Sequence, residues 1–270
     1  MEPNAILTIF AVLVLLGIPV TSVIDTRRGG GLDAEELEFR RAIYGSVAFS
    51  LLVMAGLTLA VATWQDVDPE ALGWSVPDAM RGFQWGVGIT LASLVIAWVV
   101  TSVLRAAGFR EGPLARLLMP RDAKETRAFL ILSGVAAICE EYVYRGFLLW
   151  VGTSWLGSPW LGAVLVSVSF GFAHWPQRFA GMMRAGTLGF TLCIPVILTG
   201  SLFPAIVAHF WINAAIGSGL WRVLLLPEEE PTETESAAGL EEDVDTEDEH
   251  VNRNNEQLDK ESDGGGGGHG

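Results

Sequence analysis

The sequence predicts an all-α protein, a polytopic bundle of about seven transmembrane helices followed by a disordered acidic tail. Half of the 270 residues are hydrophobic, the mean hydropathy is +0.40, and long stretches carry no charge. Stretches of about 20 apolar residues match the thickness of a bilayer, so this composition is typical of a membrane protein and not of a soluble domain. We therefore expect membrane lipid around the chain and no nucleic-acid partner.

Seven apolar segments are expected to form the spans. The first is predicted to be a retained helix and not a signal peptide, because no Lys or Arg precedes Arg27 and the apolar run is about 20 residues long. The sixth is short and contains Pro195. The approximate limits of the seven segments are 5–24, 43–64, 82–104, 128–150, 159–175, 185–199 and 202–224.

Basic residues alternate between the six loops that connect these segments. In order, the loops hold four, one, six, zero, two and zero Lys and Arg residues. Cytoplasmic loops carry the excess of such residues, so loops one, three and five are predicted to be cytoplasmic. We expect a multi-pass protein of the cell membrane with its N-terminus outside and its C-terminus in the cytoplasm. The counted residues are Arg27, Arg28, Arg40 and Arg41, then Arg81, then Arg105, Arg110, Arg116, Arg121, Lys124 and Arg127, and finally Arg178 and Arg184.

The distribution of charge divides the chain into two regions. Residues 1–226 hold fifteen acids and fifteen bases and are expected to form the membrane-embedded helical domain. Residues 227–270 hold sixteen acids against Arg253 and Lys260, and they end in GGGGGHG. A segment of this composition cannot bury enough apolar surface to offset its ordering entropy, so we expect a disordered cytoplasmic tail.

Two adjacent acids, Glu140 and Glu141, lie in the middle of the fourth apolar segment, in the string CEEYVYRG. Ionisable groups at the centre of a bilayer are costly and usually functional. At about 100° per residue the two acids point in different directions, and Glu141 is spaced to pair with Arg145 four residues later. This pairing leaves Glu140 on the adjacent face as a candidate general base. The alternative is that both acids only join a polar packing network.

Two later segments each place a pair of polar or aromatic groups on one helical face. Phe170 and His174 are four residues apart in FGFAH, and His209 and Asn213 are four apart in HFWIN. His174 alone, near a span end, would more often be an interfacial residue. Together with the acid pair, these groups predict a shared polar cavity inside the membrane.

The chemistry that these residues suggest is the activation of water for peptide hydrolysis. Glu140, aided by His174, would take a proton from a water molecule that attacks a peptide carbonyl. His209 and Asn213 could donate hydrogen bonds to the resulting oxyanion. Alternatively, Glu140, His174 and His209 could hold a zinc ion, because two histidines and a carboxylate form a known catalytic set.

The three motifs together resemble the CPBP family of intramembrane proteases, also called the Rce1-like or Abi family, which process CAAX proteins and bacteriocins. The resemblance rests on EExxxR at Glu140, Glu141 and Arg145, FxxxH at Phe170 and His174, and HxxxN at His209 and Asn213. It covers about residues 120–222, the expected protease core.

The resemblance implies an endopeptidase that hydrolyses a peptide bond of a membrane-associated protein, for which a prenylated CAAX-type protein is the family's best-known substrate. It implies that Glu140 activates water with help from His174, and that His209 and Asn213 form the oxyanion site. Glu141, Arg145 and Phe170 would support the architecture. No cofactor is expected to be required, with zinc as the alternative, and the expected partners are lipid and a membrane-anchored protein or peptide.

Two other functions use the same residues. A proton-coupled transporter could employ acids and histidines as a relay, although such carriers usually contain internal repeats and none is apparent in this sequence. A catalytically silent scaffold or immunity protein could retain the fold and would tolerate the loss of Glu140.

The expected span limits raise one geometric difficulty. With straight helices, His174 would lie near the cytoplasmic edge, about 15 Å in depth from Glu140 and Asn213. We therefore expect tilting, displacement or a broken helix, which Gly171 and Pro176 would allow.

Overall fold

The computed structural model describes residues 2–27, 40–76, 78–111, 115–116 and 118–225. The chain divides into two units, 1–228 and 229–270. The second unit and the whole of the predicted acidic tail, 227–270, lie outside the described residues. Within the described part of the first unit the regular elements are helices, which confirms the predicted all-α class.

The first three long helices are α1 (Ala5–Arg27), α2 (Arg40–Trp64) and α3 (Ala79–Ala106). Between α2 and α3 lies a short 3₁₀ turn, η2 (Pro69–Leu72), which is capped by the side chain of Asp68 and followed by Gly73 with a positive φ of 80°. Many large apolar side chains on these three helices are exposed, among them Leu13, Phe49 and Leu91. Such faces suit contact with lipid tails and not with water.

The next helix is continuous from residue 123 to residue 156 but changes its winding. It consists of α5 (Ala123–Glu140), the π-helical segment η3 (Glu141–Leu148) and α6 (Leu149–Leu156). The side chain of Asp122 accepts hydrogen bonds from the backbone at the start of α5, and Gly157, with a φ of 64°, ends α6. This helix extends six residues beyond the predicted end of the fourth span.

The remaining helices return through the bundle. They are α7 (Pro159–Ala173), the 3₁₀ turn η4 (Trp175–Gln177), α8 (Arg178–Thr199), α9 (Phe203–Ala215), the π-helical turn η5 (Ile216–Leu220) and α10 (Trp221–Leu224). The sixth predicted span is longer than expected, because α8 begins seven residues earlier and continues through Pro195. Arg184, which the sequence analysis assigned to a loop, therefore lies inside a helix.

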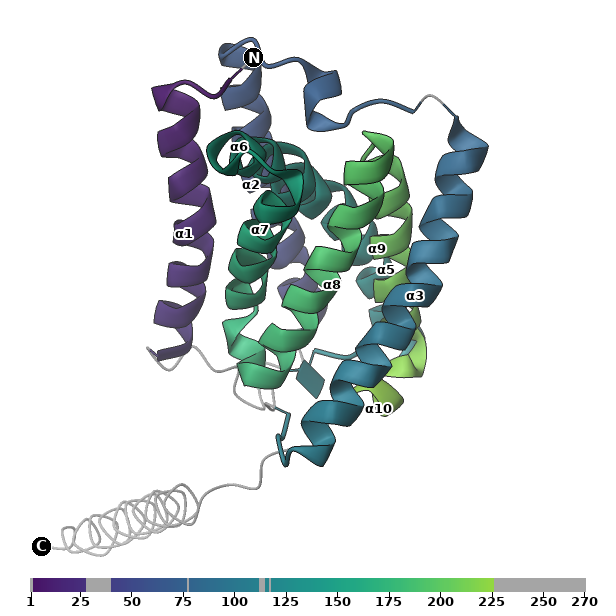
Figure 1. The fold of residues 1–270 in the computed structure, drawn as a ribbon. Helices are drawn as coiled ribbons and strands as arrows, with labels where there is room; N and C mark the ends of the chain where they lie inside the picture. The colour runs from purple at the N-terminus through teal and green to yellow at the C-terminus, as the bar shows by residue number, and fades with distance from the viewer. Residues whose placement is uncertain (1, 28–39, 77, 112–114, 117, 226–270) are drawn as a thin grey trace, which may run out of the picture. The chain divides into compact units, whose positions relative to one another are not determined.

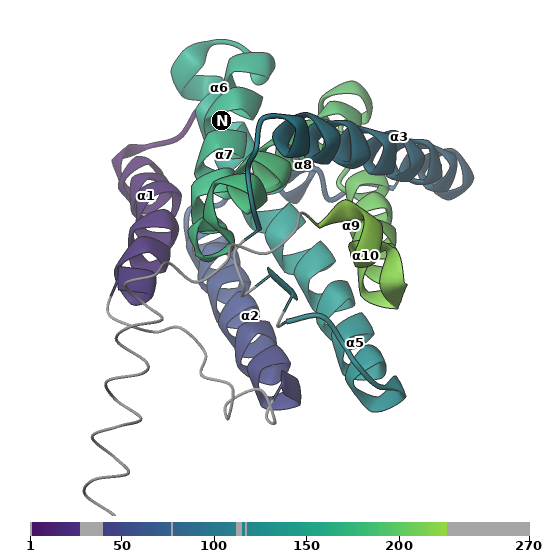
Figure 2. The same ribbon diagram turned by 90° about the horizontal axis from the view of Figure 1, so that it is seen from below.

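The helices form two layers. Figure 1 shows α1, α7, α8 and α3 in the front layer, with α2, α5 and α9 behind them, and Figure 2 shows α5 between α2 and α9; the contacts between helices agree with this order. Successive long helices run in alternating directions. Five of them, α1, α2, α3, α9 with α10, and α8 with η4, are long and apolar enough to cross a membrane. The protein is thus a multi-pass membrane protein.

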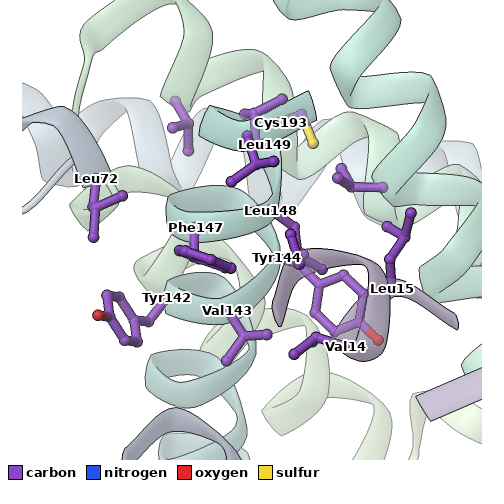
Figure 3. Packing of buried hydrophobic residues seen from close by; sticks show 14 of the residues in the cluster. Val14, Leu15, Leu72, Tyr142, Val143, Tyr144, Phe147, Leu148, Leu149 and Cys193 are labelled. Atoms are coloured by element: carbon purple, nitrogen blue, oxygen red, sulfur yellow. The ribbon is translucent and has the colours of Figure 1, made fainter. Parts of the chain in front are cut away.

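The segment η3 lies at the centre of this arrangement and is buried on all sides. It contacts helices of both layers, including α1, α2, α7 and α8. In Figure 3, Tyr142 and Phe147 lie on the side of Leu72 from η2, whereas Tyr144 and Leu148 lie towards Val14 and Leu15 of α1. Because η3 follows Glu140 directly, this packing holds the motif EExxxR in a closely packed environment.

Candidate active site

One cavity of about 280 Å³ is lined by all four residues that the sequence analysis assigned to catalysis. Glu140 reaches it from the end of α5, His174 from the end of α7, and His209 and Asn213 from α9. Apolar side chains of α2, α5, α8 and α9 form most of the remaining wall. Leu118 and Leu225 also line the cavity, together with Leu224 at the end of α10, the short helix at the bottom of the bundle in Figure 1. The structure therefore brings these four side chains to one place, while their catalytic roles remain a prediction.

The two adjacent acids have different surroundings. The Glu141 side chain is fully buried, does not line the cavity, and accepts hydrogen bonds at Oε1 from Arg145 Nη1 at 2.9 Å and from the ring of His209. The Glu140 side chain lines the cavity and retains 19% of its accessible surface. The predicted division between a paired acid and a cavity-facing acid is therefore present, even though η3 is π-helical and does not follow a regular 100° repeat.

His209 lies between the two acids. Its Nδ1 is 2.6 Å from Glu141 Oε1, and its Nε2 is 3.8 Å from Glu140 Oε2. The short contact requires Nδ1 to donate to the carboxylate, because a carboxylate can only accept. This contact orients the ring so that Nε2 faces the cavity side of the site. The distance of 3.8 Å is too long for a direct hydrogen bond between Nε2 and Glu140.

His174 is held by the backbone of its own helix. Its Nδ1 is 2.8 Å from the carbonyl oxygen of Phe170, so this nitrogen donates and Nε2 is left for other partners. The residue ends α7, with φ of −93° and ψ of 20°, and Pro176 follows two residues later. A proline shortly after a helix end is a common stop signal, which explains why the helix ends at this point.

The expected difference in depth does not separate Glu140 from His174, because both side chains line the same cavity. Glu140 precedes Gly157 by 17 residues, and His174 follows Gly157 by 17 residues. The helices α6 and α7 on either side of the turn at Gly157 contact each other, and Figure 1 shows α6 nearly end-on while α7 runs along the bundle. The chain therefore changes direction here instead of continuing one straight span.

The guanidinium of Arg145 is enclosed by protein groups. Besides its bond to Glu141, its Nη2 donates to the carbonyl oxygen of Gly189 at 3.1 Å, and its Cζ lies 4.6 Å from the centroid of the Phe170 ring. The Phe170 ring also lies 4.7 Å from the ring of His174. Phe170 thus connects the buried ion pair to the cavity, a contact that the spacing FxxxH alone did not reveal.

These motifs also match a known family. Residues 123–215 match the family model described as type II CAAX prenyl endopeptidase Rce1-like. The resemblance to the CPBP family is confirmed. The match begins at the first residue of α5 and ends at the last residue of α9, so it includes every catalytic candidate. It supports a CAAX-type intramembrane protease fold for the Rce1-like segment. No curated protein and no solved structure matches the chain significantly.

The described residues do not contain the group of ligands that the zinc alternative needs. Among the described residues of the Rce1-like segment and its surroundings, no three His, Cys, Asp or Glu side chains are arranged to hold a metal ion. Glu140, His174 and His209 line one cavity but do not form such a group. That no metal is required stays a prediction.

One charged pair at the cavity was missed by the sequence analysis. Arg184 of α8 lines the cavity, and its Nη2 donates to Glu111 Oε1 at 2.6 Å. Glu111 is fully buried and lies before the Rce1-like segment. The two residues are 73 positions apart, so no local spacing connects them. The sequence offered one signal. Arg184 directly precedes the apolar segment 185–199, so a helix that began a few residues earlier would include it.

Proposed function

We propose that this protein is an intramembrane endopeptidase that hydrolyses a peptide bond of a membrane-anchored protein with water activated by Glu140. The observation that supports it best is the common cavity of Glu140, His174, His209 and Asn213. The Rce1-like match points to the same reaction class. The apolar walls suit a lipid-modified substrate, and a prenylated CAAX-type protein is the substrate class that the family description suggests.

In the proposed reaction, the oxygen of a water molecule bonds to the peptide carbonyl carbon while Glu140 accepts a proton from that water. His174 assists through Nε2, because its Nδ1 already donates to the Phe170 carbonyl. The carbonyl oxygen becomes an oxyanion that accepts hydrogen bonds from His209 and Asn213. When the carbon–nitrogen bond breaks, the proton held by Glu140 passes to the leaving amine, so that the carboxylate is restored.

The surroundings of His209 suit the proposed oxyanion role. Because Nδ1 donates to Glu141, a second N–H at Nε2 requires the imidazolium form. Glu141 and Glu140 lie on the two sides of the ring and supply compensating negative charge. In this scheme Glu141 positions His209, in addition to its bond with Arg145.

The decisive experiment compares cleavage of a farnesylated peptide by the wild-type chain and by Glu140→Gln in detergent micelles. The amide keeps the size of the side chain but cannot act as a base, so we expect a loss of kcat of at least 10²-fold with an unchanged melting temperature. Glu70→Gln, at an exposed site in η2 outside the cavity, is the matched control and should cleave normally. Full activity of Glu140→Gln would remove the assignment of the base.

We also propose that the cavity faces the cytoplasm, with the N-terminus outside. In the described chain, the basic residues near helix ends gather where α2 begins, α3 ends and α5 begins, whereas Arg81 lies at the opposite end. Asp66→Cys and Arg121→Cys test this orientation with a membrane-impermeant maleimide in intact cells. We expect labelling at position 66 only; labelling at position 121 only would reverse the orientation.

A further inference from the structure

Arg184 is a positively charged residue at the cavity and is held by an ion pair with Glu111, whereas Glu140 at the same cavity is an acid. Among the described residues that line the cavity, it is the only Lys or Arg, and Glu140 is the only Asp or Glu. The Arg184 side chain is 90% buried, with 10% of its surface accessible. The cavity therefore combines the proposed base with one fixed cation.

Glu111 holds the guanidinium without using all of its donors. The bond from Nη2 to Glu111 Oε1 fixes the plane of the group, but Nη1 is buried and has no hydrogen-bond partner among the described residues. A buried N–H without an acceptor is unfavourable, so a ligand that brings an oxygen to Nη1 would recover this loss. A carboxylate suits the planar guanidinium well, because its two oxygens can accept from neighbouring N–H groups.

The cavity favours a peptide end over a lipid headgroup as the source of this carboxylate. Its volume of about 280 Å³ lies near the lower limit for small-ligand sites, which a short peptide end would fill, and an endopeptidase, the activity in the description of the matching family, acts on a peptide. Gln177 and Gly181, seven and three residues before Arg184, also line the cavity.

We propose that the guanidinium of Arg184, which lines the cavity, binds the C-terminal carboxylate of the peptide substrate. This inference rests on the proposed function and names the part of the substrate that the site recognises. If Arg184 holds the C-terminal carboxylate, the fixed positions of Arg184 and Glu140 determine how far from its C-terminus the substrate is cut. Arg184 is thus a specificity-determining residue and not a catalytic one.

The test measures binding of two fluorescent farnesylated peptides that differ only in ending with a carboxylate or a carboxamide. The full-length Glu140→Gln protein in detergent micelles is used, so that neither peptide is cleaved. We expect the carboxylate peptide to bind at least ten-fold more tightly than the carboxamide, as is usual for a hydrogen bond to a charged group.

Two further variants in the same Glu140→Gln background separate binding from folding. Glu111→Gln breaks the ion pair but keeps Arg184, and it should preserve or increase the preference for the carboxylate. Glu111→Gln with Arg184→Gln removes both charges, which avoids an isolated buried ion, and it should reduce the preference to less than two-fold. A merely structural pair would give the same ratio in both variants.

Four outcomes would overturn the proposal: equal binding of the two peptides, no binding of either, a preference that survives the loss of Arg184, or displacement of both peptides by phosphatidylglycerol with an affinity that depends on Arg184. The last would assign the cation to a lipid phosphate. Cleavage by the wild-type chain is measured in the same preparation. If cleavage is absent while the ten-fold binding preference is present, the proposed function fails and the carboxylate site stands.

Discussion

Two buried arginine–glutamate pairs in this protein have similar chemistry but different surroundings. Arg145 pairs with Glu141 in the centre of the bundle, where Gly189 and the Phe170 ring also contact the guanidinium. Arg184 pairs with Glu111 at the wall of the cavity. The first pair is enclosed by protein groups and suits a structural role, whereas Arg184 of the second pair lines a space that a ligand can enter. A buried ion pair therefore shows its role by what surrounds it.

Removing the two arginines in turn should give the largest effects and tests this comparison directly. Arg145→Ala breaks a fully buried ion pair and leaves Glu141 with the His209 ring as its hydrogen-bond partner, which we expect to reduce the free energy of unfolding by about 3–5 kcal/mol. Arg184→Ala should cost less, about 1–3 kcal/mol, because the Arg184 side chain lines the cavity and solvent can enter the space it leaves. Unfolding in detergent, followed by circular dichroism, measures both. Equal losses would contradict the distinction between an enclosed and an open pair.

Phe170→Leu tests how much the aromatic ring stabilises the enclosed ion pair of Arg145 and Glu141. Loss of the ring from beneath the Arg145 guanidinium is expected to cost about 2 kcal/mol, because the cation is desolvated there. Phe172→Leu on the same helix is the matched control, since Phe172 is exposed, and it should change stability by less than about 0.5 kcal/mol. Similar unfolding midpoints for the two variants would show that the ring contact contributes little.

Gly189→Ala probes how closely α8 approaches the enclosed pair. A Cβ atom at this position would lie 3.2 Å from Phe170 Cδ1 and 3.4 Å from Arg145 Nη2, so we expect a loss of about 1 kcal/mol from crowding. Gly134→Ala in α5 would contact nothing within 4 Å and should be neutral or stabilising by up to about 1 kcal/mol. Thermal melting of the two variants side by side gives the answer; stabilisation by Gly189→Ala would show that the contact is loose.

The smallest expected effect is at Asp122. Its carboxylate accepts hydrogen bonds from backbone N–H groups and not from an arginine. The backbone N–H of Glu125, above all, holds the pKa of the Asp122 carboxyl below its usual value of 3.8. Its charge therefore stabilises α5 above pH 3.8, and this contribution is lost as the pH falls through the lowered pKa. Asp122→Asn keeps the capping oxygen, so its melting temperature should approach that of the wild type in acid. A constant difference at all pH values would contradict this.

Much of the fold followed from patterns that are local in the sequence. Apolar segments of about 20 residues predicted helices at all seven expected places, because the thickness of a bilayer sets the length of a span. The i, i+4 spacings predicted that Glu141 would meet Arg145, and the contact is present. The boundaries were less accurate: α6 and α8 extend beyond the expected limits, because a change of charge is a poor marker of where a helix ends.

The sequence by itself determined the class of protein, the helices, the three motifs and the family that they resemble, because each depends on residues a few positions apart. The tertiary structure decided which groups meet across long intervals. Glu141 contacts His209 across 68 positions, and Glu111 contacts Arg184 across 73. The packing of the helices also decided that Glu140 and His174 line one cavity. Such contacts follow from the packing of whole helices, which no local spacing encodes.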